Sequence, residues 1–178
     1  EVEITTGENG LPDLDGCEFT FAVENAYLPF NYIDATTGEA MGWDYDVFNY
    51  MGELMNFTPV YVPTAWDGMI QATADGQFMI AGDGITITAE RDEIVDFSDG
   101  YINLAQRVLV AVGNTEITSI EDLKSGDYIV ATQKGTTNYD FAVNALGEDK
   151  VKAFDDFNFA IQAVISVSYT HLRSHETG

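Results

Sequence analysis

Arg91 is the residue whose type and setting point most directly to chemistry. It is the only positively charged side chain among the first 106 residues, which also hold twenty acidic residues. A guanidinium can bind a carboxylate through two parallel N–H bonds. Thr88, three residues earlier, is a candidate N-cap for a short helix that would carry the arginine. The sequence therefore predicts either an anion clamp at Arg91 or a structural ion pair with Glu90, Asp92 or Asp96.

Composition and charge narrow the class of protein. The chain has 178 residues, of which 46% are apolar, and a formal net charge of −23. This size suits one domain or two small lobes with a real core. The negative charge excludes a nucleic-acid or anionic-membrane partner and favours a monomer that repels its own copies. We expect no membrane span and no signal peptide in this chain, whose first residues are typical of a mature or trimmed terminus.

Cysteine and histidine give little support for a metal or redox site. Cys17 is the single cysteine, so no internal disulfide is possible, and the polar residues before it do not favour lipidation. We interpret it as a small residue at the entrance of a strand. His171 and His175 could present two imidazoles on one helix face, but no third ligand accompanies them. No metal site and no cofactor is predicted.

Strand and helix patterns alternate along the chain. Apolar, β-prone runs predict strands at 19–23, 59–62, 78–81, 108–112, 128–131 and 151–154. Helical spacing and cap residues predict helices at 44–55, 67–74, around Arg91, from Ser119, at 135–146 and at 158–164. Asp44 and Asp46 are interpreted as structural residues that cap a helix start. The pattern indicates an α/β fold with mainly parallel sheets flanked by helices, whose ligands bind at the carboxyl ends of the strands.

Six short strings occur in the order typical of one protein family. They are residues 26–30 (Ala-Tyr-Leu-Pro-Phe), 42–46 (Gly-Trp-Asp-Tyr-Asp), 66–70 (Trp-Asp-Gly-Met-Ile), 85–91 (Ile-Thr-Ile-Thr-Ala-Glu-Arg), 96–98 (Asp-Phe-Ser) and 135–137 (Gly-Thr-Thr). Across residues 19–165 the chain resembles the family 3 extracellular solute-binding proteins, the polar amino-acid receptors of ABC importers. The resemblance implies a two-lobe periplasmic-binding-protein-like fold that closes on one amino acid.

The resemblance also implies a ligand site, residue by residue. Arg91 corresponds to the partner of the ligand α-carboxylate, and Thr86 to a contact of its main-chain groups. Tyr27 and Trp66 resemble the aromatic pair around the ligand side chain. The remaining expected contacts are Asp83 and Gly84 near the α-ammonium, Glu24 at the polar end of the side chain, Thr137 with its backbone N–H at a helix start, and Asn138 beside it.

Departures from the family pattern suggest a C-terminally truncated protein. Met79 stands where the family commonly has an aspartate, and the second-lobe acid that would neutralise the ligand ammonium is missing. We expect lobe one at 1–107, a partial lobe two at 108–165 and a non-native-looking tail at 166–178. The tail is expected to pack poorly, and the chain to bind amino acids weakly or not at all.

Three function classes follow from the resemblance. The first is a periplasmic or extracellular binding protein that delivers a cationic or neutral polar amino acid to a membrane permease. The second is the ligand-sensing domain of a signalling receptor. The third is a cyclohexadienyl-dehydratase-like enzyme with Glu24 and Asp83 as candidate general acids, which the lack of a nucleophile–base pair disfavours.

Overall fold

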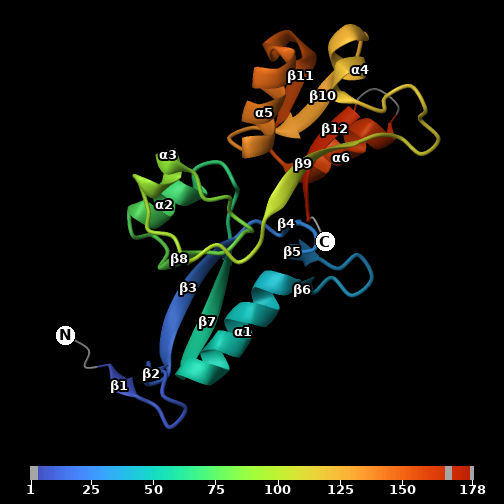
Figure 1. Cartoon of the computed structure of the whole chain (residues 1–178). Helices are drawn as coiled ribbons and strands as arrows, with labels where there is room; N and C mark the ends of the chain where they lie inside the picture. The colour runs from blue at the N-terminus through green and yellow to red at the C-terminus, as the bar shows by residue number, and fades with distance from the viewer. Residues whose placement is uncertain (1–3, 167–169, 177–178) are drawn as a thin grey trace. The chain divides into compact units, whose positions relative to one another are not determined.

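The chain divides into two compact units, Glu1–Phe97 and Ser98–Gly178, which are called here the first and the second unit. The computed structural model describes residues 4–166 and 170–176 (Figure 1). Both units combine helices with parallel strand pairs, which confirms the predicted α/β class. Within those described residues, no helix has the length and apolar character needed to cross a membrane.

The first unit is built on a three-stranded parallel sheet in the order β7-β3-β8. Its strands are β3 (Cys17–Val23), β7 (Phe57–Pro63) and β8 (Ile80–Ala81). Cys17 opens β3, as predicted, and its thiol is free and exposed. Pro59 and Pro63 lie in β7, at the edge of the sheet, where a missing N–H costs least.

Short elements surround this sheet. The helices are α1 (Trp43–Met55), α2 (Met69–Ala74) and α3 (Ala89–Asp92), and α1 packs along β7 (Figure 1). A hairpin pairs β1 (Thr5–Thr6) with β2 (Pro12–Asp13). A second small sheet joins β4 (Ala26–Tyr27), β5 (Asn31–Ile33) and β6 (Ala40–Met41).

Aromatic side chains fill the core between α1 and the sheet. Phe21 of β3 is fully buried, and its ring lies 4.4 Å from that of Phe48 on α1 and 5.8 Å from that of Tyr61 on β7. Tyr61 in turn lies 4.4 Å from Tyr45. Such tilted ring pairs stabilise a core beyond the area that they bury, so these contacts fix α1 against β3 and β7.

The second unit is a four-stranded sheet in the order β11-β10-β12-β9. Its strands are β9 (Leu104–Leu109), β10 (Val130–Gln133), β11 (Val151–Phe154) and β12 (Thr170–Glu176). β10 is buried along its whole length and runs parallel to both of its neighbours, while β12 and β9 are antiparallel. The helices are α4 (Ile120–Ser125), α5 (Thr137–Leu146) and α6 (Phe157–Ile165), with a 3-10 turn at Glu148–Lys150.

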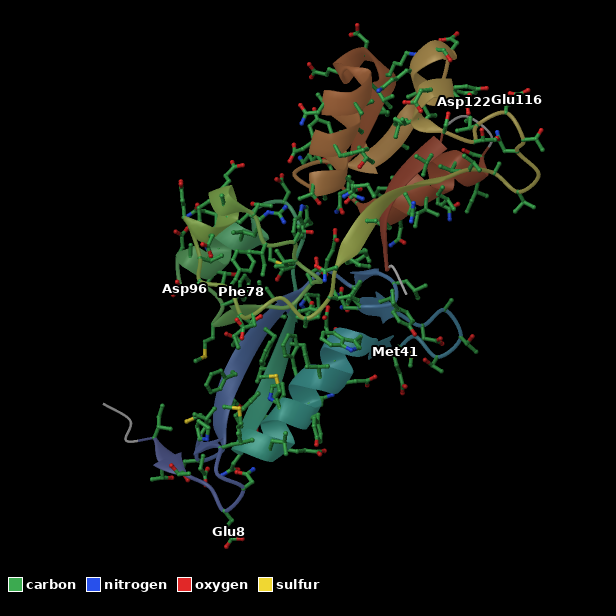
Figure 2. The ribbon with its side chains drawn as sticks, viewed as in Figure 1. Glu8, Met41, Phe78, Asp96, Glu116 and Asp122 are labelled. Atoms are coloured by element: carbon green, nitrogen blue, oxygen red, sulfur yellow. The ribbon has the colours of Figure 1, made fainter. Side chains whose placement is uncertain are left out.

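Side-chain caps start the helices of the second unit. Ser119 Oγ accepts from the N–H of Asp122, and the Asp122 carboxylate accepts from the N–H of Ser119, which completes a capping box. Figure 2 labels Asp122 together with Glu116, whose carboxylate accepts from the hydroxyl of Tyr128 at 3.0 Å. The Thr136 side chain caps α5 by accepting from the N–H of Tyr139, and the Asp156 side chain caps α6 by accepting from the N–H of Asn158. The sequence predicted the first of these starts from its residue types.

Two strands differ from the sequence-based expectation. The strand predicted at 108–112 lies instead at Leu104–Leu109, where it pairs with β12. The lobe boundary at 107 stays a prediction. Residues 170–176, expected to pack poorly, form β12 inside the sheet. Strand pairing uses backbone groups that almost any residue supplies, so composition alone did not reveal it. The expectation for 167–169 and 177–178 lies outside the described residues.

Candidate functional site

Arg91 lies in the short helix α3, and the chain around it holds both its backbone and its guanidinium. Thr88 Oγ1 accepts from the Arg91 N–H at 3.2 Å, which confirms Thr88 as the N-cap. The Nη1 atom of Arg91 donates to the carbonyl of Thr86 at 2.9 Å. A guanidinium has five N–H donors in a rigid plane, so a bond at one nitrogen orients the fork and is compatible with binding a carboxylate.

Trp66 lies beneath this guanidinium. The Arg91 Cζ is 5.2 Å from the centroid of the Trp66 ring, within the range of a cation–π contact. Only 9% of Trp66 is exposed, and it belongs to a core cluster with Ala22 and Met69. Phe78, labelled in Figure 2, packs against the same cluster. In the first unit, Trp66 therefore supports the arginine with one face, in addition to the ligand contact predicted for it.

Tyr27 and Gly84 lie side by side. A Cβ atom placed on Gly84 would come within 2.9 Å of the Tyr27 ring and 3.1 Å of the Phe30 ring, and its φ of +54° is left-handed. Only glycine combines that backbone with this close approach at low cost. The Tyr27 and Phe30 rings are 4.9 Å apart. Gly84 thus lets an aromatic wall approach the turn that follows β8.

Asp83 is buried and bonded, in a setting that the sequence did not predict. It is 4% exposed and accepts from the side-chain amide of Asn31 at 2.5 Å and from the backbone of Glu24. Asn31 also donates to Asp44 at 2.8 Å. We call Asn31, Asp44 and Asp83 the carboxyl cluster. Its bond to the Glu24 backbone brings two of the predicted site residues together.

Burial sets the charge of this cluster. Desolvation raises the pKa of Asp83 well above its usual value, and the neighbouring Glu24 and Asp44 carboxylates add to the rise. Desolvation also raises the pKa of Asp44 to about 6, with the Asn31 hydrogen bond acting in the opposite direction. Two buried carboxyls that share one amide repel each other when both are ionised, so the ionised form of the pair is disfavoured.

The interpretation of Asp44 as a helix cap is wrong. Helix α1 begins after Gly42, which supplies no side-chain cap. The first N–H groups of the helix donate instead to main-chain carbonyls: Trp43 to Pro29 at 3.0 Å, and Asp44 to Phe30 at 2.9 Å. The Asp44 side chain is left for the buried amide of Asn31, a partner thirteen residues away that local patterns do not show.

Thr137 and Asn138 lie in the first turn of α5, in the second unit. Helix N-termini carry N–H groups without intrahelical partners and a partial positive charge, so this turn can bind an anion. Thr136 caps the helix through the N–H of Tyr139 at 3.2 Å. Asn138 is buried and donates to Gln106 of β9 at 3.1 Å.

The sequence reasoning missed two polar residues, Asn31 and Asn25. Asn31 Oδ1 accepts from the N–H of Asn25 at 2.7 Å, and Asn25 Oδ1 accepts from the hydroxyl of Tyr45 at 2.7 Å. The positive φ of Asn25, 63°, is a conformation that asparagine tolerates. An asparagine between a strand and an aromatic motif was the one available signal. No group of three metal-binding side chains occurs within the residues that the structure describes.

The chain is similar to known amino-acid-binding proteins. It is 34% identical over 138 residues to a probable histidine-binding protein of Neisseria gonorrhoeae, a match that covers 77% of this chain and 50% of the relative. The crystal structure of the ancestral amino acid-binding protein AncCDT-1, a precursor of cyclohexadienyl dehydratase, has a TM-score of 0.83 at 34% identity over 88% of this chain and 70% of that one. An ancestral arginine-binding protein bound to arginine has a TM-score of 0.80 at 30% identity over 90% and 71% of the two chains.

These matches confirm the predicted family and two-lobe fold class, and they show that the chain corresponds to only part of its relatives. It spans about half the length of the curated relatives that it matches. A family model matches residues 19–173, so the match continues into β12. The chain belongs to the bacterial extracellular solute-binding proteins, family 3.

Proposed function

We propose that the chain is part of the substrate-binding protein of an ABC importer, which captures one polar amino acid and delivers it to a membrane permease. Family membership supports the class, and the relatives named for histidine and arginine support the ligand type. We further propose a periplasmic or extracellular, monomeric protein that needs no cofactor. The net charge of −23 fits a monomer without a nucleic-acid partner.

The observation that carries the proposal is the arrangement around Arg91. The guanidinium lies over the Trp66 ring and donates to the Thr86 carbonyl. An arginine held in this way is oriented before a ligand arrives, which lowers the entropy cost of binding a carboxylate. We assign Arg91 to the α-carboxylate, Thr86 to the main chain of the ligand and the backbone N–H of Thr137 to a carboxylate.

The ligand side chain is assigned from charge. The first unit has many acidic residues and Arg91 as its single lysine or arginine. Glu24 and the faces of Tyr27 and Trp66 attract a cation, because a carboxylate is negatively charged and the face of an aromatic ring has a negative electrostatic potential. We therefore propose a cationic or neutral polar amino acid, with glutamate and aspartate disfavoured.

We propose binding without catalysis. One similar structure is described as a precursor of a dehydratase, so an acid near the ligand is the relevant feature. Burial raises the pKa of Asp83, as a general acid would need, but Asp83 is 4% exposed and its oxygen accepts from Asn31. A general acid must reach the atom that it protonates. An assay for dehydration of a cyclohexadienyl acid is expected to show no turnover.

Calorimetry on the complete product of the gene that encodes these 178 residues tests the proposal. L-arginine, L-lysine, L-histidine or L-glutamine is expected to bind, and L-glutamate is not. Arg91→Lys keeps the charge but loses the planar fork, so affinity should fall at least about tenfold, or about 1.4 kcal/mol. Arg107→Lys, at an exposed position on β9, is the control. Unchanged affinity in Arg91→Lys, or no binding by any of the amino acids, contradicts the proposal.

A further inference from the structure

The carboxyl cluster lies behind the segment that carries two of the expected ligand contacts. Asn31 is fully buried, Asp44 is 1% exposed and Asp83 is 4% exposed. They come from β5, from the first turn of α1 and from the turn after β8. One amide therefore joins three elements, and both of its donor bonds go to carboxylates, at 2.8 and 2.5 Å.

The same cluster bonds to the backbone of the first two residues of the segment 24–27, which we call the recognition segment. Asn31 Oδ1 accepts from the Asn25 N–H at 2.7 Å, and Asp83 accepts from the backbone of Glu24. The Tyr45 hydroxyl donates to the Asn25 side chain at 2.7 Å. Three bonds therefore fix two consecutive residues, one of which has a left-handed φ. Glu24 and Tyr27 take their positions from this short stretch.

Asn31 is suited to this place because it is neutral and has both donors and an acceptor. The titratable groups that face the cluster are Glu24 from the loop after β3, Asp44 and Tyr45 from α1, Tyr61 from β7 and Asp83 itself. Asp46, also on α1, acts on Tyr61. All of these are acids, so a further negative charge would be repelled from every side. An amide is a group that bonds to two carboxyls without adding charge.

We propose that Asn31 is a positioning residue for ligand recognition: it ties the buried carboxyls of Asp44 and Asp83 to the backbone of the recognition segment and so sets where Glu24 and Tyr27 stand. This inference rests on the proposed function, because it assigns Asn31 to the same ligand site. Asn31 itself contacts the segment and not the ligand.

The principal test is Asn31→Asp, which keeps the shape, removes the two donors and adds an ionisable group. The readouts are L-arginine affinity by calorimetry, at about pH 5 and about pH 8, and amide exchange at Glu24 and Asn25, both on the complete gene product. Relative to the wild type at the same pH, affinity should fall at least about tenfold near pH 8 and less near pH 5, where a protonated carboxyl can still donate one bond. Exchange at Glu24 and Asn25 should become faster.

A milder pair of variants keeps the test decisive if Asn31→Asp does not fold. Tyr45→Phe removes the hydroxyl that bonds to Asn25, and we expect faster exchange at Asn25 with affinity about twofold to fivefold weaker. Tyr61→Phe is the matched control, since its hydroxyl bonds to Asn49 and to the Tyr45 carbonyl, outside the recognition segment. Equal effects of the two substitutions would overturn the inference.

The outcomes separate this inference from the proposed function. If the wild type binds amino acids and a folded Asn31→Asp binds equally well at both pH values, the positioning role is refuted and the proposed function stands. If the wild type binds no amino acid, the proposed function fails and this inference fails with it. A fall in affinity that is larger near pH 8, together with faster exchange at Glu24 and Asn25, supports it.

Discussion

The helices of the second unit start differently from α1 and α2 of the first unit, whereas the short helix α3 of the first unit has a side-chain cap, Thr88. In the second unit Ser119, Thr136 and Asp156 cap α4, α5 and α6 through bonds within three residues of the helix start. In the first unit α1 and α2 follow Gly42 and Gly68, which offer no side chain. The first N–H groups of α1 are taken by carbonyls of Pro29 and Phe30, from a different element. Helix starts in the second unit are local features, whereas α1 depends on the tertiary fold.

Gly42→Ala should have the largest effect. A Cβ at Gly42 would lie 2.3 Å from the Phe30 carbonyl oxygen, and its φ of +131° is a region used almost only by glycine. The substitution should destabilise the first unit by about 3 kcal/mol or more. Urea unfolding followed by tryptophan emission measures it, since Trp43 and Trp66 are both in this unit.

Gly68→Ala is the control for that prediction. Its φ is +88°, but nothing lies within 4 Å of the added Cβ, so about 1 kcal/mol is expected from the backbone alone. Similar losses of unfolding free energy in the two variants would show that the Phe30 carbonyl moves aside at low cost. The start of α1 would then depend less on the Pro29 and Phe30 carbonyls than their bonds suggest.

The pH dependence of stability tests the buried carboxyls of the first unit. The folded pKa of Asp44, about 6, lies above the value of 3.8 for a free aspartate, so the folded state holds the proton more tightly. The proton on Asp44 therefore adds to the free energy of unfolding. This contribution is complete below about pH 4 and is lost as the pH rises through about 6, a change of up to about 3 kcal/mol. Asp44→Asn should flatten this fall in the free energy of unfolding.

Asp46→Asn, at an exposed position two residues further along α1, is the matched substitution for comparison. Unfolding by urea at several pH values between about 4 and 7 supplies the comparison. An identical slope in the wild type and in Asp44→Asn would mean that Asp44 keeps an ordinary pKa, and that the amide of Asn31 compensates fully for its burial.

Lys150 gives the second unit its own long-range bond. Its Nζ donates to the carbonyls of Leu123, Lys124 and Gly126, at 3.1, 2.7 and 2.7 Å. These groups lie at the C-terminal end of α4, where a positive charge is favoured. Lys150→Met should cost about 2 kcal/mol, seen as faster amide exchange in α4 and β10. Lys152→Met, at an exposed position on β11, is the control, and equal exchange in the two variants would argue against the capping role.

Ser119→Ala should have the smallest effect. It removes one half of the capping box, for which about 1 kcal/mol is expected. The measurement is thermal unfolding followed by far-ultraviolet dichroism. Ser125→Ala, at the other end of α4, removes a bond to a carbonyl inside the helix and should cost less. A larger loss at Ser125 would mean that the start of α4 is held by its packing and not by its cap.

The same contrast explains what the sequence could predict. The short helix start at Thr88 and the capping box at Ser119 follow from residues within four positions of each other. The α/β class follows from the alternation of local strand and helix patterns along the chain. The carboxyl cluster could not be found in this way, because Asn31 and Asp83 are 52 positions apart. The predicted bounds of β9 were shifted and β12 was missed, because strands pair through backbone groups that almost any residue type supplies. For the proposed ligand site, motifs named Arg91 and Thr86, while the contact of Trp66 with Arg91 and the bonds of Asn31 needed the fold.

The two prolines of β7 have a consequence for how copies of this protein behave when crowded together. Pro59 and Pro63 are four residues apart in a strand, so their nitrogens, which carry no hydrogen, point to the same edge of β7. Because a proline nitrogen cannot donate to β3, that side faces away from the sheet. A foreign strand that approached there would find donors missing at alternate positions. The acidic surface keeps copies apart at a distance, and the prolines hinder edge-to-edge aggregation once they touch.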